Sequence, residues 1–272
     1  MEEQNNQNTV SDDSQMTKKE RRELKKQQKE EDKVKRVRSK KTKRVVSWVV
    51  VLVLLGGVVW AMAYFGGKGV ERDDSGTVIL STDITTEDWI KGNPNAELVL
   101  VEYSDFQCPA CGAYYPLVKQ LSEDFGDRLA IVYRHFPLIT IHKNAELAAR
   151  ASEAAGKQGK FWEMHDVIFE TQSAWSNLNR EEAEKSFVSI AERLDLNVTQ
   201  FVAHLNADDI ANAVNDDIAS ARSSAVNATP TFFLNGKKLT NPNSYEAFKE
   251  IIQNSLSASE LDQGAGAESE SN

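Results

Sequence analysis

The feature that most constrains this chain is an uncharged apolar segment of 21 residues, Val45–Phe65. As an α-helix, a segment of this length extends about 30 Å, enough to cross the hydrocarbon core of a bilayer. We therefore expect a membrane-spanning helix here. A cleaved signal peptide is the alternative, because Ala61-Met62-Ala63 fits the pattern of a cleavage site. Against it, the apolar run and the basic region before it are longer than is usual for a signal peptide.

The charge of the chain differs on the two sides of this segment. Residues 1–44 contain 15 Lys and Arg and 9 Asp and Glu, a net charge of +6, whereas residues 45–272 contain 17 and 32, a net charge of −15. Basic residues beside a span stay on the cytoplasmic side of a membrane. We therefore expect a cytoplasmic N-terminus and an extracytoplasmic domain after Gly66. The basic tail has too few apolar residues for a core, so we expect it to be disordered or a solvated helix, without a role in nucleic-acid binding.

The part after the apolar segment has three regions of different composition. Residues 66–91 contain Gly-rich stretches without periodicity, and we expect a linker there. A globular domain is expected at residues 92–256. The tail at residues 257–272 is rich in Ser, Glu, Gly and Ala, and we expect it to be disordered.

Within the domain, two short apolar runs, Leu98–Tyr103 and Leu129–Arg134, are typical of buried strands. A helical pattern from about Gly112 to Phe125 separates them, so the order strand, helix, strand predicts a parallel pair of strands. Further along, Thr231–Leu234 and Lys237–Leu239 flank Asn-Gly, a dipeptide that favours the tight turn of a hairpin. These elements indicate an α/β fold.

The remaining elements are expected to be helices. Residues 142–224 contain long Ala-rich, charge-studded segments with a period of 3.6, which predict several packed helices inserted between the strands. A last helix is expected from Tyr245 to about Ser255.

The chain contains two cysteines in all, Cys108 and Cys111, between the first predicted strand and its helix. At the start of a helix, free backbone N–H groups and the positive end of the helix dipole stabilise a thiolate. Pro109 suits the first helical position, where its missing N–H has no cost. We therefore expect Cys108 to be a reactive nucleophile and Cys111, one turn further into the helix, to be the resolving thiol.

Three other interpretations of the cysteine pair are possible on these residues. A structural disulfide across so short a loop would stabilise the fold little. A zinc site needs two further ligands, and the four histidines show no metal-binding spacing with the pair or with each other. The third alternative is two unreactive buried thiols.

The segment LVLVEYSDFQCPACGAYYPLVKQL, residues 98–121, resembles the active-site segment of the DsbA-like branch of the thioredoxin superfamily. Residues 227–233, NATPTFF, resemble the segment of that family in which a Thr or Val precedes a cis-proline beside the disulfide. The resemblance extends over about residues 90–255. It implies a thioredoxin-like fold with a helical insertion and a thiol–disulfide oxidoreductase that needs no cofactor and no metal.

The resemblance also implies roles for three further residues. Glu102 falls where the family has a buried acidic residue that relays a proton for the buried cysteine, although a strand Glu between apolar neighbours can also lie exposed at a sheet edge. Thr229 and Pro230 fall in the cis-proline segment, where the backbone of Thr229 would pair with an extended substrate strand. The alternative for Thr229-Pro230 is an ordinary trans loop.

The expected reaction is thiol–disulfide exchange through a mixed disulfide on Cys108. An extracytoplasmic location favours the donation of disulfides to exported, cysteine-containing proteins. The resemblance implies a membrane redox partner, of the quinone-reductase type, that reoxidises the pair. The strongest oxidants of the family have a histidine where this chain has Ala110, so we expect a less extreme potential. An isomerase or reductase of the same fold, or a tethered binding domain without catalysis, are the alternatives.

Overall fold

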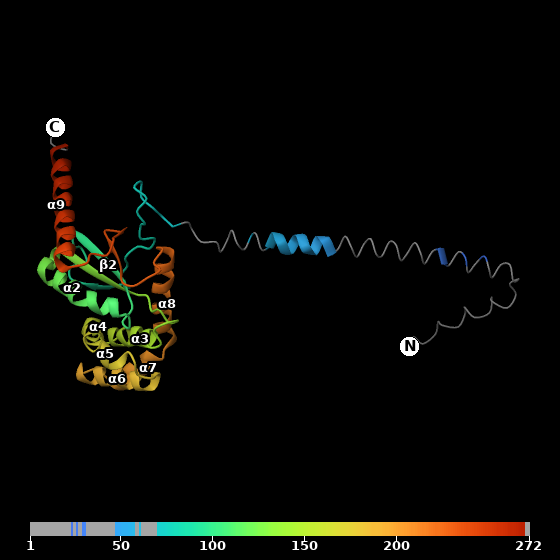
Figure 1. Cartoon of the computed structure of the whole chain (residues 1–272), viewed down its shortest axis with the longest axis horizontal. Helices are drawn as coiled ribbons and strands as arrows, with labels where there is room; N and C mark the ends of the chain where they lie inside the picture. Colours follow the sequence, from blue (N-terminus) through green and yellow to red (C-terminus); the bar gives the residue numbers. More distant parts are fainter. Residues whose placement is uncertain are drawn as a thin grey trace, which may run out of the picture. The chain divides into compact units, whose positions relative to one another are not determined.

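The structure, a computed structural model, describes residues 23, 26, 29, 30, 47–57, 60 and 70–269. The chain divides into two units, Met1–Gly67 and Lys68–Asn272 (Figure 1). In the first unit residues 47–57 are helical, and the rest of the expected span except residue 60 lies outside the described residues, as does most of the basic tail. None of the helices in the described ranges has the length and hydropathy needed to cross a membrane.

The second unit is built on a five-stranded sheet. Its strands lie in the order β1 (Trp89–Lys91), β3 (Leu129–His135), β2 (Leu98–Ser104), β4 (Thr231–Leu234) and β5 (Lys237–Lys238). β2 and β3 are parallel, as predicted, and the other neighbouring pairs are antiparallel. The predicted α/β class and parallel pair are therefore confirmed.

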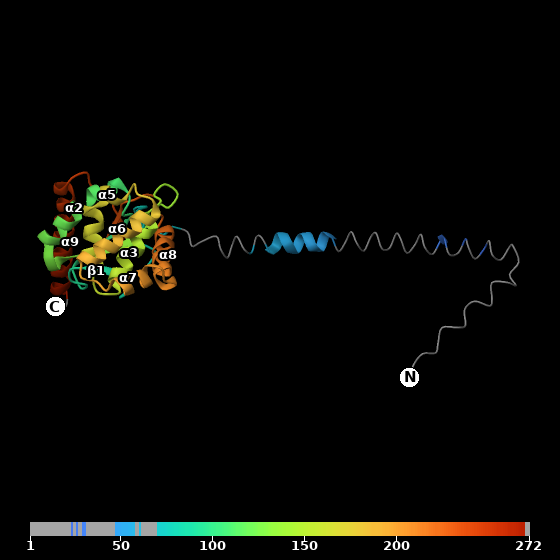
Figure 2. The same ribbon diagram turned by 90° about the horizontal axis from the view of Figure 1, so that it is seen from below.

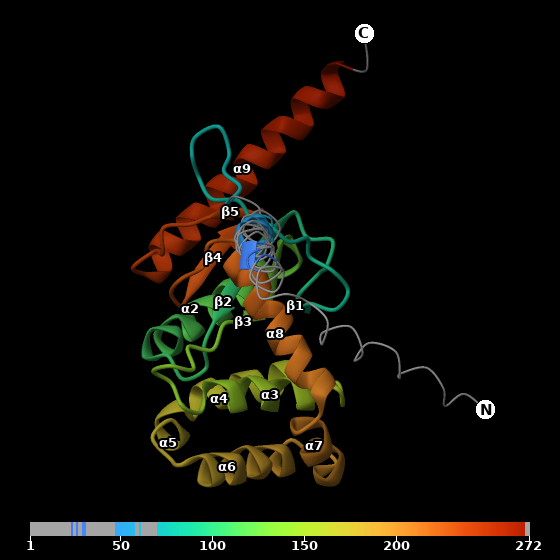
Figure 3. The ribbon, with the colours of Figure 1, turned by 90° about the vertical axis from the view of Figure 1, so that its right-hand side faces the viewer.

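Helices cover both faces of the sheet. Helices α2 (Pro109–Phe125) and α9 (Tyr245–Ser269) lie on one face, and α8 (Asp208–Ser223) lies on the other (Figure 3). Alternate residues of β2 point to opposite faces: Leu98 and Leu100 pack with α2 and α9, whereas Val101 and Tyr103 pack with α8. β2 is therefore buried on both sides, and Glu102 shares the face of Leu100.

The helical insertion predicted at residues 142–224 is confirmed. Between β3 and β4 the chain forms α3 (Ala145–Gly156), α4 (Phe161–Glu170), α5 (Gln172–Trp175), α6 (Arg180–Arg193), α7 (Val198–Leu205) and α8. In Figures 1 and 3, α3 and α4 lie between the sheet and α6, and Figure 2 looks onto α6 and α7 from below. Four of the six buried alanines of α3 lie in one core cluster with Phe161 and Met164, where their small side chains let the neighbouring helices approach closely.

The start of the domain differs from the expectation of a linker as far as residue 91. β1 lies inside that range and pairs with β3, and the Trp89 ring stacks on Phe161 with centroids 4.3 Å apart. Val78 and Leu80 also pack against the core beneath α8. The described residues from about Val78 therefore belong to the domain, and the short strand lacked the periodicity that would have revealed it.

The end of the domain also differs from the prediction. α9 runs from Tyr245 to Ser269, well beyond the predicted end near Ser255, so most of the tail expected to be disordered is helical. Leu256 is buried and continues the stripe of Phe248 and Ile252, so the packed face of the helix extends past Ser255. The last three residues lie outside the described part of the chain.

Candidate active site at the start of helix α2

Cys108 is the residue immediately before α2, with extended backbone angles (φ −70°, ψ 122°), and Pro109 is the first helical residue. The helix therefore begins three residues earlier than the predicted start at Gly112, and the pair opens it as the sequence implied. Cys108 is 8% exposed and Cys111 is completely buried. The two sulfurs are not bonded to each other in this structure.

The surroundings of the Cys108 sulfur favour its ionised form. The Cys108 thiol donates to the carbonyl oxygen of Thr229 at 3.6 Å, a contact of the protonated form, but the other neighbours of the sulfur favour ionisation. The hydrogen bond with the Cys111 thiol is the main cause that lowers the pKa of Cys108, to about 5. The side chain of Thr229 and the backbone N–H groups of Ala110 and Cys111 act in the same direction, whereas partial burial opposes them. At neutral pH, Cys108 is therefore expected to be a thiolate.

Cys111 has the opposite environment. Burial raises its pKa above the ordinary value, and the neighbouring Cys108 and the charge of Glu102 raise it further. The backbone N–H of Asp105 donates to its sulfur at 3.5 Å. The helix start therefore holds one sulfur that is readily ionised and one that is kept as a thiol.

Thr229 lies beside Cys108 although 121 residues separate them in the sequence. The Thr229–Pro230 peptide bond is cis, as the resemblance implied. Pro230 is buried directly before β4, and its carbonyl accepts a hydrogen bond of 2.7 Å from the Asn241 side chain. This segment forms the wall of the site opposite α2.

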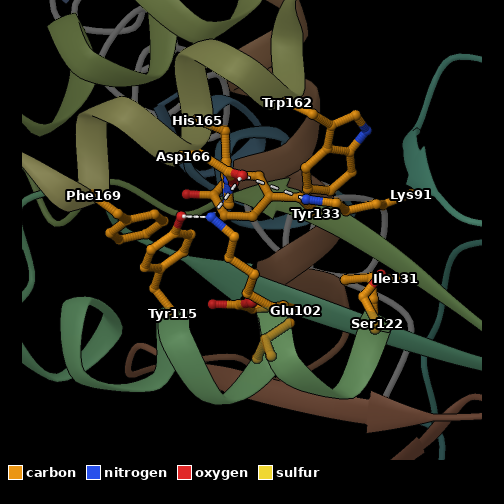
Figure 4. Close-up of a pocket in the computed structure, with 12 residues that line it drawn as sticks. Lys91, Glu102, Tyr115, Ser122, Ile131, Tyr133, Trp162, His165, Asp166 and Phe169 are labelled. Carbon is orange, nitrogen blue, oxygen red and sulfur yellow. Dashed lines mark hydrogen bonds and ion pairs between the residues drawn. The ribbon is translucent and has the colours of Figure 1, made fainter. Parts of the chain in front are cut away.

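Glu102 is buried on the central part of the sheet rather than exposed at an edge, with 3% of its surface accessible. Burial raises its pKa to about 7, and the Ser104 hydroxyl opposes the increase. Figure 4 shows Glu102 lining a pocket together with Tyr115, Tyr133 and His165. The cavity, about 20 Å³, has room for roughly one water molecule.

Charged groups from α2 and α4 surround the outer part of this pocket. The Lys119 ammonium lies 3.5 Å from the Asp166 carboxylate and 3.2 Å from Glu170, and it donates to the Tyr115 hydroxyl at 3.0 Å. Asp166 also lies 2.9 Å from His165 Nδ1. A buried carboxyl group thus lies at one end of a small cavity, and partly exposed titratable groups lie at the other.

Sequence reasoning missed the residues that support the cysteine loop from behind. The buried carboxylate of Asp105 accepts hydrogen bonds from the N–H groups of Gln107 (2.7 Å) and Leu138 (2.9 Å). His142 Nδ1 lies 2.6 Å from the same carboxylate. Asp directly before a tight turn is a recognisable signal, whereas nothing in the local sequence points to His142. Among the residues described, no group of three or more His, Cys, Asp and Glu side chains is placed to hold a metal ion.

Comparison with known proteins identifies the family. A sequence model described as thioredoxin matches residues 85–254. The Na(+)/H(+) antiporter NhaA 3 of Salinispora tropica is 36% identical over 181 residues, which are 66% of this chain and 26% of that protein. The antiporter NhaA of Herminiimonas arsenicoxydans is 37% identical over 73% of this chain and 30% of its own length. This chain thus spans less than a third of the length of these relatives.

Two solved structures share the fold. BdbD from Bacillus subtilis in its oxidised form is 24% identical with a TM-score of 0.58, covering 66% of this chain and 98% of that chain. Wolbachia pipientis alpha-DsbA1 is 21% identical with a TM-score of 0.59, covering 66% and 96%. The chain belongs to the thioredoxin family, with the DsbA-like fold and the Cys-x-x-Cys pair of a thiol–disulfide oxidoreductase.

Proposed function

We propose that this protein is a membrane-anchored thiol–disulfide oxidoreductase that donates disulfides to exported, cysteine-containing proteins through Cys108 and Cys111. The observation that carries the proposal is the contrast between the two sulfurs. The pKa of Cys108 is lowered to about 5, whereas burial raises that of Cys111. A stable thiolate at Cys108 favours the reduced enzyme, and this makes its disulfide a good oxidant.

The reaction begins when a substrate thiolate attacks Cys108 Sγ of the oxidised pair. The Cys108–Cys111 bond breaks, its electron pair goes to the Cys111 sulfur, and a mixed disulfide joins the substrate to Cys108. A second substrate thiolate then attacks the substrate sulfur of that mixed disulfide and releases Cys108 as a thiolate. The substrate loses two electrons and the enzyme gains them. A membrane redox partner, by analogy with the family, would take these electrons and restore the disulfide.

Glu102 is proposed to supply the proton that Cys111 takes up as it leaves. With a pKa of about 7, Glu102 is partly protonated near neutral pH, and its charge acts on the pKa of Cys111. The cavity beside Glu102 can hold a water molecule through which the carboxyl group would recover its proton from solvent. During reoxidation, Glu102 would accept the proton that Cys111 loses.

Thr229 and Pro230 are proposed to orient the substrate. The carbonyl of Thr229 already lies 3.6 Å from the sulfur that the substrate attacks. A peptide whose cysteine reaches Cys108 therefore passes beside the Thr229 backbone, where it can pair as an added strand.

The anchored, extracytoplasmic location rests on the uncharged segment Val45–Phe65 and the basic residues before it. The similarity to domains of proteins named as Na(+)/H(+) antiporters agrees with a membrane context. Protease added to intact spheroplasts should digest the domain after Gly66 and spare a tag at Met1. The reverse pattern would contradict this location.

The exchange reaction itself is tested by trapping. Cys111→Ser should leave Cys108 able to form mixed disulfides that no internal thiol resolves, so covalent complexes should accumulate on non-reducing gels and disappear with reductant. Cys108→Ser should trap few, because Cys111 is completely buried. A structural disulfide or two unreactive thiols predict no captured partners in either variant, and that result would refute the proposal.

A further inference from the structure

The side chain of Gln172 contacts the backbone of the cysteine loop from the helical insertion. It is the first residue of α5, and its Nε2 donates to the carbonyl oxygen of Phe106 at 2.7 Å and to that of Cys108 at 2.9 Å. Both acceptors are carbonyls, so the group that faces them must be the NH₂ of the amide. One side chain thus holds the peptide groups on both sides of the segment Gln107-Cys108.

The space for this amide comes from Gly112 in the first turns of α2. A Cβ atom at position 112 would lie 2.7 Å from Oε1 of Gln172, closer than real contacts allow, and 3.1 Å from its Cδ and Nε2, which is a tight contact. The Gly112 N–H also donates to the Cys108 carbonyl at 3.1 Å, so that oxygen accepts from the helix and from Gln172 together. A glycine in a helix costs stability, and here it leaves room for the amide.

A second glutamine ties the same loop to the insertion. Gln107 Nε2 donates to the carbonyl of Ser176 at 2.6 Å, and its Oε1 accepts from the N–H of Asn144 at 2.7 Å. The loop is therefore hydrogen-bonded to the helical insertion at both ends of α5 and just before α3. Phe106 beside it is buried, so the loop has little freedom to shift.

We propose that Gln172 is a positioning residue for Cys108: its amide fixes the carbonyls beside the cysteine and so sets how well the start of α2 stabilises the sulfur as an anion. The inference rests on the proposed function and names a residue outside the family's cysteine and proline segments. The carbonyl that Gln172 holds belongs to the Cys108–Pro109 peptide group, and the next two peptide groups carry the N–H groups of Ala110 and Cys111 that favour the thiolate. Moving that peptide group changes their direction toward the sulfur.

The test measures the equilibrium of the full-length chain with glutathione and the pH dependence of Cys108 alkylation. Gln172→Glu replaces the donor by a carboxylate that repels both carbonyls and the thiolate. It should raise the pKa of Cys108 and change the equilibrium constant at least tenfold toward the oxidised enzyme, about 30 mV more reducing. Gln172→Ala should change it in the same direction by several-fold. Gln158→Glu is the matched control, because the side chain of this half-buried glutamine bonds, among the described residues, to the backbone of Asn197 and is not in contact with the cysteine loop.

A double-mutant cycle separates positioning from folding. Gly112→Ala should displace the amide and shift the redox equilibrium like Gln172→Ala, although alanine favours the helix. In the Gln172→Ala background the same substitution should have no further redox effect. If the variants melt earlier but keep the wild-type equilibrium and alkylation profile, or if the two changes add, the inference is wrong. If the wild-type pair shows no reversible disulfide at all, the proposed function fails instead.

Discussion

Two buried ionisable residues on neighbouring strands, one facing each side of the sheet, differ in how many partners surround them. Glu102 on β2 faces α2, and Arg134 on β3 faces α8, and each has 3% of its surface exposed. Arg134 forms a bidentate pair with Asp88, at 2.6 and 3.0 Å, and its remaining N–H groups bond four other oxygen atoms. For Glu102, burial and one hydroxyl are the principal influences on its pKa.

The contrast distinguishes a structural charge, which serves only stability, from a chemical one, which can exchange a proton during a reaction. A buried charge that is fully paired keeps its proton state at every ordinary pH, and its removal leaves partners buried and unpaired. A buried carboxyl group with few partners has its pKa moved toward neutrality, so it can gain and lose a proton during a reaction. Glu102 therefore has the environment of a group suited to proton transfer, whereas Arg134 has that of a paired structural charge. Asp217 on α8 is a second buried carboxyl group whose pKa burial raises to about 7, so the proposed role of Glu102 rests also on its position beside Cys111.

The largest expected effect is on the face of the sheet that α8 covers, where Arg134 is paired with Asp88. Arg134→Leu leaves the buried Asp88 carboxylate without its partner, so the free energy of unfolding should fall by about 3–5 kcal/mol. Urea unfolding of the full-length chain measures the loss. Arg128→Leu is the control, because that half-exposed arginine pairs with carboxylates at the surface and should cost at most about 1 kcal/mol. Equal losses in both variants would remove the distinction between the two faces.

The second prediction concerns Glu102 and pH. Its pKa in the folded protein is raised from an ordinary 4.5 to about 7. Below about pH 4.5 the carboxyl group is neutral in both the folded and the unfolded chain, so its burial then has no charge to desolvate. Stability is then lost as pH rises through about 7, by about 3 kcal/mol in total. Relative to Glu102→Gln, the wild type should lose this amount between about pH 4 and pH 8 in unfolding experiments. Glu250→Gln, at an exposed position, should show no such trend, and a pH-independent difference for Glu102→Gln would refute the assignment.

The parts of the fold that local sequence encodes were predicted correctly. The strand, helix and strand around the cysteines, the Ala-rich insertion and the Asn-Gly hairpin each follow from patterns within about ten residues. The burial of Glu102 and the cis bond before Pro230 followed only from family resemblance, because both depend on elements distant in the sequence.

The parts that were not predicted depend on contacts between distant residues. β1 is too short to show a period, and its place at the sheet edge depends on stacking of Trp89 on Phe161. Gln172 lies among ordinary helical residues, and only its position opposite the carbonyl of Cys108 reveals a connection to the site. Hydrogen bonds between a side chain and a remote backbone group leave no periodic signal in a sequence.

The third prediction adds a charge beside Cys108, at the start of α2. Ala110 is exposed between the cysteines, and its N–H helps to lower the pKa of Cys108. Ala110→His should stabilise the thiolate further and make the pair more oxidising, by about 30 mV for each unit of pKa if only the reduced form is affected. Ala113→His, an exposed position one turn further along α2, should have a smaller effect. A shift to more reducing values would contradict this account of the site.

The smallest expected effect compares one serine on each face. Ser220 on α8 bonds Thr82 at 3.0 Å, Arg134 at 3.1 Å and the Tyr103 hydroxyl, so Ser220→Ala should cost about 1–2 kcal/mol of unfolding free energy without changing the pH dependence due to Glu102. Within the part of the chain that the structure describes, the buried Ser104 hydroxyl has no partner with good hydrogen-bond geometry. Ser104→Ala should therefore change stability at low pH very little.

Its effect should appear in the titration of Glu102 instead. The Ser104 hydroxyl opposes the increase in the pKa of Glu102, so its removal should raise that pKa further, by less than about one unit. The pH at which the wild type and the Glu102→Gln chain diverge in stability should then move upward in the Ser104→Ala background and stay in place in the Ser220→Ala background. A shift in both backgrounds would mean that the two faces of the sheet are electrostatically coupled, and the separation of structural from chemical charge would then fail.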